Sequence, residues 1–467
     1  MLQDQLGLAT PQAPGGETHR MAPLRYVTRA FVRYAERYIP DPFLYTVILT
    51  FVTVAAALVW TPTSPVKVLD AWYGGLWTIL TFAAQMALIL ATGVALADAP
   101  VVKRLLCGLA ALPKQQTSAA VTVFLGAAIA SWVNWGLGFV VGAVVAREIA
   151  KRQRDVDFGF LVAAAYMGTM TWASGLSSSI ALATATPGSA LNLVEKVTGR
   201  IAGLDETIFT AYNLVPTILL VVLIPIVLHF IAPEAKDMKR ADAERLAREP
   251  AASAPEPGER TFASVLNNSW LVTALLVAMG AAYEWHRIAT SGFSLDINTF
   301  IFLALFLGLA LHARPIRYVQ SFGNAAKTVG AILLQFPLYG GIMGIITVSG
   351  LANLIAEWFV SFSTQGTLAF WSFIASNIIS VFVPSGGGHW AVQGPFMVPA
   401  AVKLGADPAM VAMAVAMGEQ TANMLQPFWA LPLLSIAHLG IKDIMGYCFI
   451  ALMVGLTLYG GSLLIFA

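Results

Sequence analysis

Apolar segments of about 17 to 25 residues recur along this chain, and they limit the available folds more than any other feature. A helix of that length crosses roughly 30 Å of hydrocarbon, and its backbone satisfies its own hydrogen bonds there. The composition agrees, because 11% of the residues are charged, against about 25% in an average soluble domain. We therefore expect an all-α polytopic membrane protein with about nine full spans.

Four of the apolar segments are interrupted by residues that a lipid-exposed helix rarely tolerates. In the second half the interruptions run from Pro384 to His389, with three successive glycines, and from Gly418 to Asn423. In the first half they lie around Asn134 and within residues 169–179. Irregular backbone survives at membrane depth when it is buried in protein or lines a wet cavity, and secondary transporters build their binding sites from such breaks. The pattern indicates a solute transporter.

Charge and composition divide the chain into five parts. Residues 1–18 are predicted to be a disordered tail, and residues 19–40 a basic amphipathic helix that lies in the lipid interface. Residues 41–232 form the first half, residues 233–290 a cytoplasmic linker with one extra span, and residues 291–467 the second half. The net charge of +2 gives no reason to expect a nucleic acid partner, so the expected surroundings are the lipid bilayer.

Each half is expected to contain a re-entrant helical hairpin and an unwound transmembrane helix. In the first half these are residues 116–146 and 158–185, and in the second half residues 367–400 and 408–437. Lys and Arg flank the first hairpin on both sides, whereas only Lys403 lies near the second. Under the positive-inside rule the two hairpins enter from opposite faces, and the N-terminus is cytoplasmic.

The two halves match when one is shifted by 250 positions without a gap. Residues that coincide at the breaks are Gly136 with Gly386, Gly138 with Gly388, and Thr171 with Thr421. An odd number of expected spans precedes the second half, which is therefore inverted in the membrane. Two inverted repeats with paired breaks predict one central site and alternating access.

The breaks contain no Lys or Arg, so a bound anion would rely on hydroxyl groups and on the free N–H groups at the starts of half-helices. Glycines let a ligand approach the backbone closely, although in membrane helices they also serve close packing alone. The candidate residues for binding substrate or ion are Asn134, Gly136, Gly138, Thr171, Ser174, Ser385, Gly386, Gly388, His389, Glu419, Gln420, Thr421 and Asn423. No catalytic residue, metal site or cofactor is predicted.

Two ionisable residues, His389 and Glu419, lie deep in the expected membrane segments. A buried carboxylate costs several kcal/mol unless it is paired, protonated or bound to a cation, so Glu419 is a candidate carrier of H+ or Na+. His389 is a candidate proton carrier or donor to a carboxylate. The alternative for each is a hydrogen-bonded structural role. Candidates for the wall of an apolar chamber, or for plain packing, are Trp132, Trp135, Trp172, Trp390 and Trp429.

The segments from Pro384 to Pro395 and from Gly418 to Trp429 resemble the signature of the bacterial short-chain fatty acid transporter family. The similarity runs from about Arg25 to the C-terminus. It implies import of short-chain monocarboxylates, such as acetoacetate or butyrate, across the bacterial inner membrane.

The chain is also similar to the ion-transporter superfamily that contains the sodium/dicarboxylate carriers, which implies elevator motion and a homodimer. Those carriers have Ser-Asn-Thr motifs at their hairpin tips. The matching positions here read Val133-Asn134-Trp135 and Pro384-Ser385-Gly386, and this departure bears on both sodium coupling and dicarboxylate specificity.

The leading hypothesis is a secondary symporter that imports a short-chain monocarboxylate with a coupled cation. The alternative is a symporter or exchanger of other organic anions, such as dicarboxylates. A polytopic membrane enzyme that uses His389 and Glu419 belongs to a different class, and the inverted duplication disfavours it because an enzyme needs no two-faced symmetry. The chain has no G-x-x-x-x-G-K-[ST] motif, which disfavours direct use of ATP.

Overall fold

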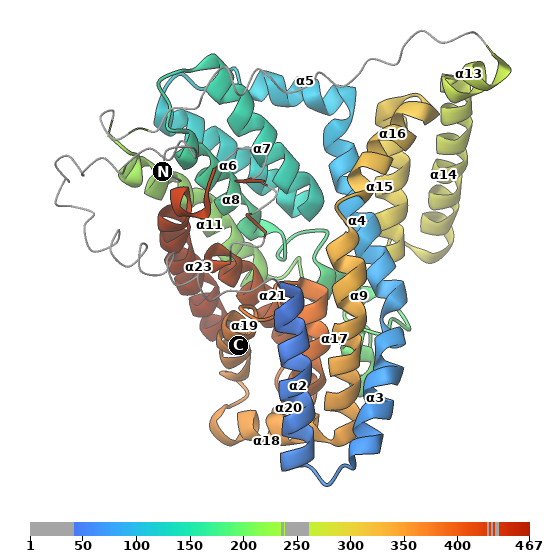
Figure 1. Cartoon of the computed structure of the whole chain (residues 1–467), viewed down its shortest axis with the longest axis vertical. Coiled ribbons are helices and arrows are strands. Elements are labelled where there is room, and N and C mark those ends of the chain that lie inside the picture. The colour runs from blue at the N-terminus through green and yellow to red at the C-terminus, as the bar shows by residue number, and fades with distance from the viewer. Residues whose placement is uncertain (1–41, 235–237, 239–260, 427–428, 431–432, 435–438) are drawn as a thin grey trace, which may run out of the picture. The chain divides into compact units, whose positions relative to one another are not determined.

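The structure of the protein is a computed structural model (Figure 1). It describes residues 42–234, 238, 261–426, 429–430, 433–434 and 439–467. Within this part every regular element is a helix and there is no β-strand, as the sequence predicts. The described residues belong to one compact unit, Pro40–Ala467. The predicted tail (1–18), the predicted basic helix (19–40) and most of the predicted linker lie outside the described residues.

The first half of the chain folds into helices joined mostly by short connections. They are α2 (Pro42–Trp60), α3 (Pro65–Thr78), α4 (Leu80–Asp98), α5 (Pro100–Leu109), α6 (Gln116–Val133), α7 (Trp135–Arg152), α8 (Phe158–Gly168), the 3-10 turn η1 (Thr169–Thr171), α9 (Ser179–Ala185), α10 (Leu193–Thr198) and α11 (Ala211–Ile231). The sequence predicts a span over about residues 73–97. The apolar run of α3 and α4 starts earlier, because Ser64 caps α3 through the N–H of Lys67 and Pro65 occupies the first turn.

The second half repeats much of this order. Its helices are α13 (Phe262–Asn267), α14 (Trp270–Ser291), α15 (Ile297–His312), α16 (Pro315–Ala326), α17 (Gly330–Ser349), α18 (Leu351–Phe362), α19 (Leu368–Ile379), α20 (Gly386–Leu404), α21 (Pro408–Ala422), η2 (Asn423–Leu425), η3 (Ile441–Asp443) and α23 (Met445–Ile465). Shifted by 250 positions, the first residues of α6, α7 and α8 fall within two residues of the first residues of α19, α20 and α21.

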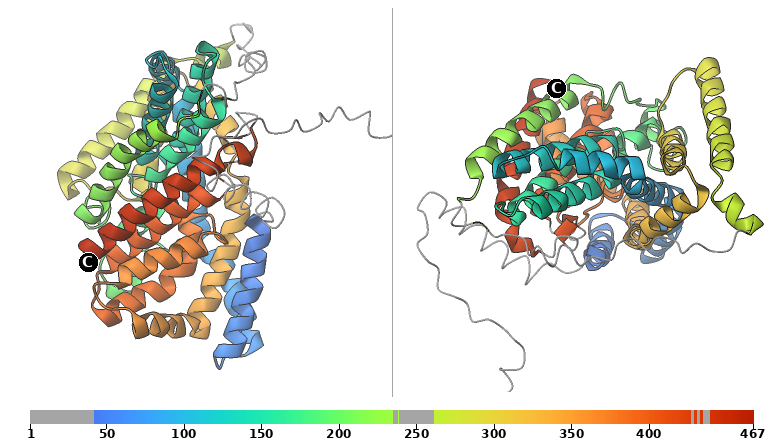
Figure 2. Two further views of the ribbon diagram at one scale, coloured as in Figure 1. Left: turned by 90° about the vertical axis from the view of Figure 1, so that its left-hand side faces the viewer. Right: turned by 90° about the horizontal axis from the view of Figure 1, so that it is seen from above.

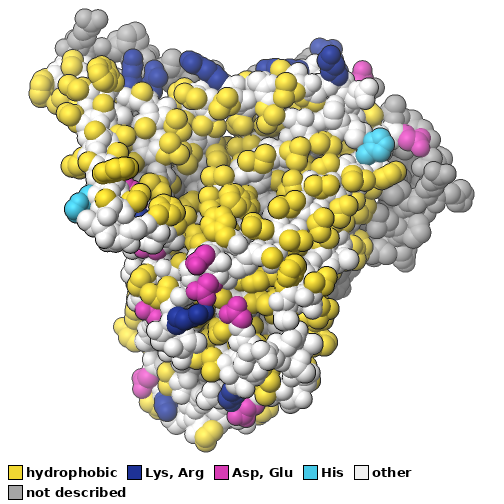
Figure 3. Space-filling model, turned by 180° about the vertical axis from the view of Figure 1, so that it is seen from behind, with side chains coloured by type: hydrophobic (Ala, Val, Ile, Leu, Met, Phe, Trp, Pro, Cys, Tyr) yellow, Lys and Arg dark blue, Asp and Glu magenta, His cyan; other side chains and the backbone are white. Residues whose placement is uncertain are grey.

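The outer surface of the helices suits a bilayer. Six helical stretches among the described residues are long and apolar enough to cross a membrane, and four further apolar helices are shorter, at 10–17 residues. Large apolar side chains such as Phe51 on α2 and Phe230 on α11 are mostly exposed, at 69% and 78%. Figure 3 shows this apolar surface, with Lys and Arg side chains along the upper end and further charged side chains of both signs in the lower part. The protein is a multi-pass membrane protein.

Packing divides the helices into two groups. The framework helices are α2, α3, α4, α14, α15, α16 and α17, and the break helices are α6 to α11 and α19 to α23, which contain all four predicted interruptions. The groups lie side by side (Figure 2) and meet where α4 packs on α7 and α17 packs on α20. Two short helices connect them, and Figure 1 shows α5 at one end of the molecule and α18 at the other.

The framework is held together by a close crossing of α3 and α17. A Cβ atom on Gly75 would lie 2.4 Å from the carbonyl oxygen of Gly340, and a Cβ atom on Gly340 would lie 2.4 Å from that of Gly75. Only glycine lets the two backbones approach so closely, which is how helices pack tightly where lipid supplies no hydrophobic driving force. This crossing joins a helix of the first half of the chain to a helix of the second half.

Candidate functional site

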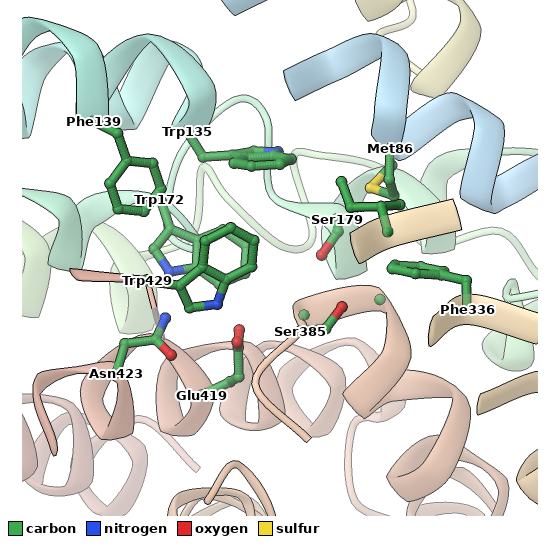
Figure 4. Close-up of a pocket in the computed structure, with 13 residues that line it drawn as sticks. Met86, Trp135, Phe139, Trp172, Ser179, Phe336, Ser385, Glu419, Asn423 and Trp429 are labelled. Carbon is green, nitrogen blue, oxygen red and sulfur yellow. The ribbon is translucent and has the colours of Figure 1, made fainter. Parts of the chain in front are cut away.

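A cavity lies where the two groups of helices meet (Figure 4), and about 450 Å³ of space, part of it open to solvent, is associated with it. Its walls combine aromatic rings with a few polar groups. The lining residues are Met86, Trp135, Phe139, Trp172, Ser179, Ile332, Phe336, Ser385, Gly386, Gly387, Glu419, Asn423 and Trp429. Met86, Ile332 and Phe336 belong to the framework, and all the others to the break helices.

The start of α20 opens into this cavity. Ser385 occupies the N-cap position in extended conformation, and no side chain caps the helix. The first hydrogen bond inside the helix runs from the N–H of His389 to the carbonyl oxygen of Ser385, at 2.6 Å. The N–H groups of Gly386 and Gly387 precede that bond, so neither has an acceptor within the helix. With the positive end of the helix dipole, they form a site suited to an anion.

The glycines at this position are also required by packing. A Cβ atom on Gly386 would lie 2.4 Å from the Oγ of Ser179 and 2.5 Å from the ring of Trp172. A Cβ atom on Gly387 would lie 2.2 Å from the ring of Phe82. Close packing, one of the two roles predicted for glycine, therefore applies to Gly386 and Gly387.

Glu419 projects from α21 into the cavity, and Asn423 follows it one helical turn later (Figure 4). The Glu419 side chain is fully buried, and among the described residues no group donates a hydrogen bond of normal geometry to either of its carboxylate oxygens. The Oδ1 of Asn423 and the Oγ of Ser179 are also buried without a partner in this part of the chain. The bare charge of a carboxylate in such a place would cost several kcal/mol.

The start of α7 matches the start of α20 in the sequence, but its first N–H groups are hydrogen-bonded by side chains of the protein. The Oδ1 of Asn134 accepts a hydrogen bond from the N–H of Leu137 at 3.1 Å, and its Nδ2 donates to the carbonyl oxygen of Ile89 at 3.2 Å. The N–H of Trp135 donates to the Oγ of Ser177 at 2.9 Å. The two helix starts therefore differ, since one is capped from within and the other faces the cavity.

Side chains of each unwound span form hydrogen bonds with the backbone of the other. The Oη of Tyr166 on α8 donates to the carbonyl oxygens of Asn423 and Gln426, at 2.7 and 3.1 Å. In the other direction, the Oε1 of Gln420 accepts a hydrogen bond from the N–H of Ala173 at 2.9 Å. Each break thus has backbone groups satisfied by a residue of the other half, as buried backbone polar groups require.

His389 lies next to the cavity wall but does not line the cavity. Its Nε2 lies 2.6 Å from the Oε1 of Gln393 and 3.3 Å from the Oγ of Ser376. The Nε2 of Gln393 donates to the carbonyl oxygen of Ser372, which leaves Oε1 as the acceptor that faces the imidazole. This network assigns a proton to the Nε2 of His389. The structure does not bring His389 and Glu419 into hydrogen-bond contact.

The structure separates the predicted site residues into two sets. Ser385, Gly386, Glu419 and Asn423 line the cavity. The others are buried in its surroundings, and they are Asn134, Gly136, Gly138, Thr171, Ser174, Gly388, His389, Gln420 and Thr421. Thr171 and Thr421, for example, donate to the backbone carbonyl oxygens of Ala128 and Met417, both at 2.7 Å.

Sequence reasoning missed several lining residues, which are Met86, Phe139, Ser179, Ile332, Phe336 and Gly387. Ser179 and Gly387 lie inside the predicted interruptions, so their position in the sequence could have indicated that they line the site. Of the five predicted wall tryptophans, Trp135, Trp172 and Trp429 line the cavity. Trp390 instead donates from its Nε1 to the carbonyl oxygen of Leu191 at 2.9 Å, and the ring of Trp132 meets that of Phe209 edge-on.

Comparison with known proteins gives a direct result. A family model described as "Short chain fatty acid transporter" matches residues 23–466. The chain belongs to the short-chain fatty acid transporter family. A member of this family from Escherichia coli strain K12 is 40% identical over 93% of this chain and 99% of the relative. Another, from Haemophilus influenzae, is 38% identical over 91% of this chain and 96% of the relative. Both are named for short-chain fatty acid transport.

Two solved structures share the fold of this family member. The YdaH transporter of Alcanivorax borkumensis, reported to have an unusual topology, aligns with a TM-score of 0.57 over 91% of this chain and 98% of that chain, at 15% identity. MtrF of Neisseria gonorrhoeae, reported to illuminate a class of antimetabolite efflux pumps, aligns with a TM-score of 0.53 over 94% of this chain and 97% of that chain, at 14% identity. These likenesses concern the fold alone.

Proposed function

We propose that the protein is a secondary active transporter that imports a short-chain monocarboxylate together with a cation across the bacterial inner membrane. The observation that carries this proposal is the uncapped start of α20, which opens into an aromatic cavity beside the unpaired carboxylate of Glu419. Family membership supplies the substrate class, because its curated relatives are named for short-chain fatty acids.

The carboxylate of the substrate binds at the start of α20. The N–H groups of Gly386 and Gly387 and the hydroxyl groups of Ser385 and Ser179 supply hydrogen-bond donors there, and the dipole of a 19-residue helix adds favourable charge. Among the lining residues there is no Lys, Arg or His, so the anion depends on these neutral donors. The aromatic rings supply the apolar surface that a hydrocarbon tail prefers.

Glu419 couples the substrate to a cation. Two carboxylates in one buried cavity repel each other strongly, so the substrate anion binds only when Glu419 is protonated or holds a positive ion. The unpaired oxygens of Glu419 and Asn423 accept either a proton or a sodium ion. Cotransport follows, because the site then favours either binding the substrate anion and the cation together or binding neither of them.

The arrangement of the helices supports an elevator mechanism. The break helices carry most of the cavity lining, and they are joined to the framework through α5 and α18 at opposite ends of the molecule (Figure 1). The 250-residue offset between matching helices supports an inverted duplication in which α6 with α7, and α19 with α20, form re-entrant hairpins. The break helices would move as a body along the framework, which in a homodimer would also form the subunit contact. In this topology the N-terminus is cytoplasmic.

The test is transport by the purified protein in liposomes. We expect accumulation of labelled butyrate or acetoacetate when an inward gradient of sodium or of protons is imposed, and the gradient that drives accumulation identifies the ion. Empty liposomes and unlabelled competitor acids are the controls. Uptake of neither acid under any gradient would reject the proposal, and exchange without net accumulation would make the protein an exchanger.

A further inference from the structure

We propose that Trp135, Phe139 and Trp429, here called the tail wall, bind the hydrocarbon tail of the substrate and thereby determine its length and its single charge. The inference rests on the proposed function and adds what selects among carboxylates. Three observations lead to it. The cavity has two apolar ends, the tail wall is held in place by a hydrogen bond and ring contacts, and the lining residues offer no second site for a carboxylate.

The cavity extends in two directions from the start of α20. Figure 4 shows Phe139 at one end and Phe336 at the other, with Ser385 and Glu419 between them. A substrate whose carboxylate lies at Ser385 therefore has two apolar ends toward which its tail can point.

The end near Phe336 is lined by the framework residues Met86, Ile332 and Phe336. The rings of Phe82 and Phe336 pack there with centroids 5.9 Å apart. All three residues of the tail wall lie on break helices or on the segment that follows them. A tail held there keeps its contacts when the break helices move, so the tail points toward Phe139.

The tail wall is fixed in place. The ring of Trp429 stacks on that of Phe139 with centroids 5.7 Å apart, and it meets the ring of Trp135 edge-on at 5.8 Å. Its Nε1 donates to the carbonyl oxygen of Pro384 at 2.8 Å, next to the residue that begins the anion site. The distance between the carboxylate position and the wall is therefore set by a hydrogen bond, and Phe139 lies at the end of the cavity (Figure 4). This geometry favours a short tail.

The same wall rejects a second carboxylate. The only charged side chain among the lining residues is that of Glu419, which would repel it, and the tail wall offers three aromatic rings. A dicarboxylate would have to place one charge against apolar surface without a partner, which is costly. The protein therefore transports monocarboxylates and excludes dicarboxylates of equal length.

The experiment measures competition against labelled butyrate by a series from acetate to octanoate, and by succinate, in liposomes with the full-length protein. For the wild type we expect the strongest competition near butyrate, weak competition by octanoate and none by succinate. Phe139→Ala should lower the inhibition constant of hexanoate relative to that of butyrate by about tenfold, because the space gained holds about two more methylene groups.

Phe139→Leu, which keeps a bulky apolar side chain, should give a smaller shift and covers the case in which Phe139→Ala does not fold. Phe230→Ala on the exposed face of α11 is the matched control and should leave the series unchanged. Equal competition by succinate and butyrate, or an unchanged series in a Phe139 variant that still transports butyrate, would overturn the inference while leaving the transport function intact. Absence of butyrate uptake in the wild type would instead defeat the proposed function.

Discussion

Gln420 and Ser174, which are 246 positions apart in the chain, are joined by two hydrogen bonds. The Nε2 of Gln420 donates to the Oγ of Ser174 at 2.8 Å, and its Oε1 accepts from the N–H of Ser174 at 3.2 Å. Both side chains are fully buried. One amide therefore satisfies the backbone of the first broken span from within the second, and it makes the two breaks one structural unit.

Replacing Gln420 tests this link. Gln420→Leu should lower the free energy of unfolding by about 1–3 kcal/mol, because it leaves the buried N–H groups of Ala173 and Ser174 without an acceptor. Ser174→Ala removes one partner and keeps the backbone bonds, so its effect should be smaller. The check is the unfolding midpoint of both variants and of the double variant in detergent. Additive effects of the two substitutions on the free energy of unfolding would show that the two side chains do not interact.

The two matching helix starts should respond oppositely to substitution. Asn134→Ala removes a cap, so we expect a loss of about 1 kcal/mol of stability, with the KM for butyrate unchanged in the folded protein. Ser385 makes no side-chain cap, so Ser385→Ala should leave the unfolding midpoint nearly unchanged and raise the KM severalfold by removing a donor to the anion. Thermal unfolding and initial uptake rates measure the two effects. A raised KM in Asn134→Ala, with no change in Ser385→Ala, would place the anion at the start of α7 and contradict its placement at the start of α20.

Glu419→Gln should separate transport from coupling. The amide keeps the shape of the side chain but neither binds a cation tightly nor exchanges a proton, so concentrative uptake should fall at least about tenfold while exchange of internal for external butyrate persists. Uptake driven by an ion gradient is compared with counterflow in the same liposomes. Undiminished accumulation by this variant would remove Glu419 from the coupling mechanism.

His389 should prove structural. Its imidazole is hydrogen-bonded to Gln393 and Ser376 and does not line the cavity. We expect His389→Gln to lower the unfolding midpoint and leave the pH dependence of butyrate uptake unchanged in shape, as measured by initial rates across neutral pH. A profile that changes shape would assign the titrating group to His389.

Much of the fold is visible in the sequence, because a break in a membrane helix requires residues that stand out. The glycines from Gly386 to Gly388 and the polar run from Glu419 to Asn423 stand out in otherwise apolar segments. The structure begins α20 at Gly386, whereas α21 stays helical through most of the polar run and gives way to η2 only at Asn423. The start of α3 at Pro65 lies before the span predicted over about residues 73–97.

The composition of the cavity was less predictable. Asn134 and Ser385 occupy matching N-cap positions, yet only the second faces the cavity, because Ser177 from a distant segment closes the first. Met86 and Phe336 reach the cavity from uninterrupted apolar helices, where nothing local distinguishes them from packing residues. Such features depend on tertiary contacts, which periodicity and motif spacing do not encode.

The most direct test of the anion site is protection of a cysteine at position 385 by substrate. The native thiols, Cys107 and Cys448, are first replaced by alanine, and the alkylation of Ser385→Cys by N-ethylmaleimide is timed with and without saturating butyrate. Ser361→Cys on exposed α18 serves as the control for general effects of butyrate. We predict that butyrate slows alkylation at position 385 severalfold and leaves position 361 unchanged. Equal rates at position 385 in a variant that still binds butyrate would contradict a substrate site at the start of α20.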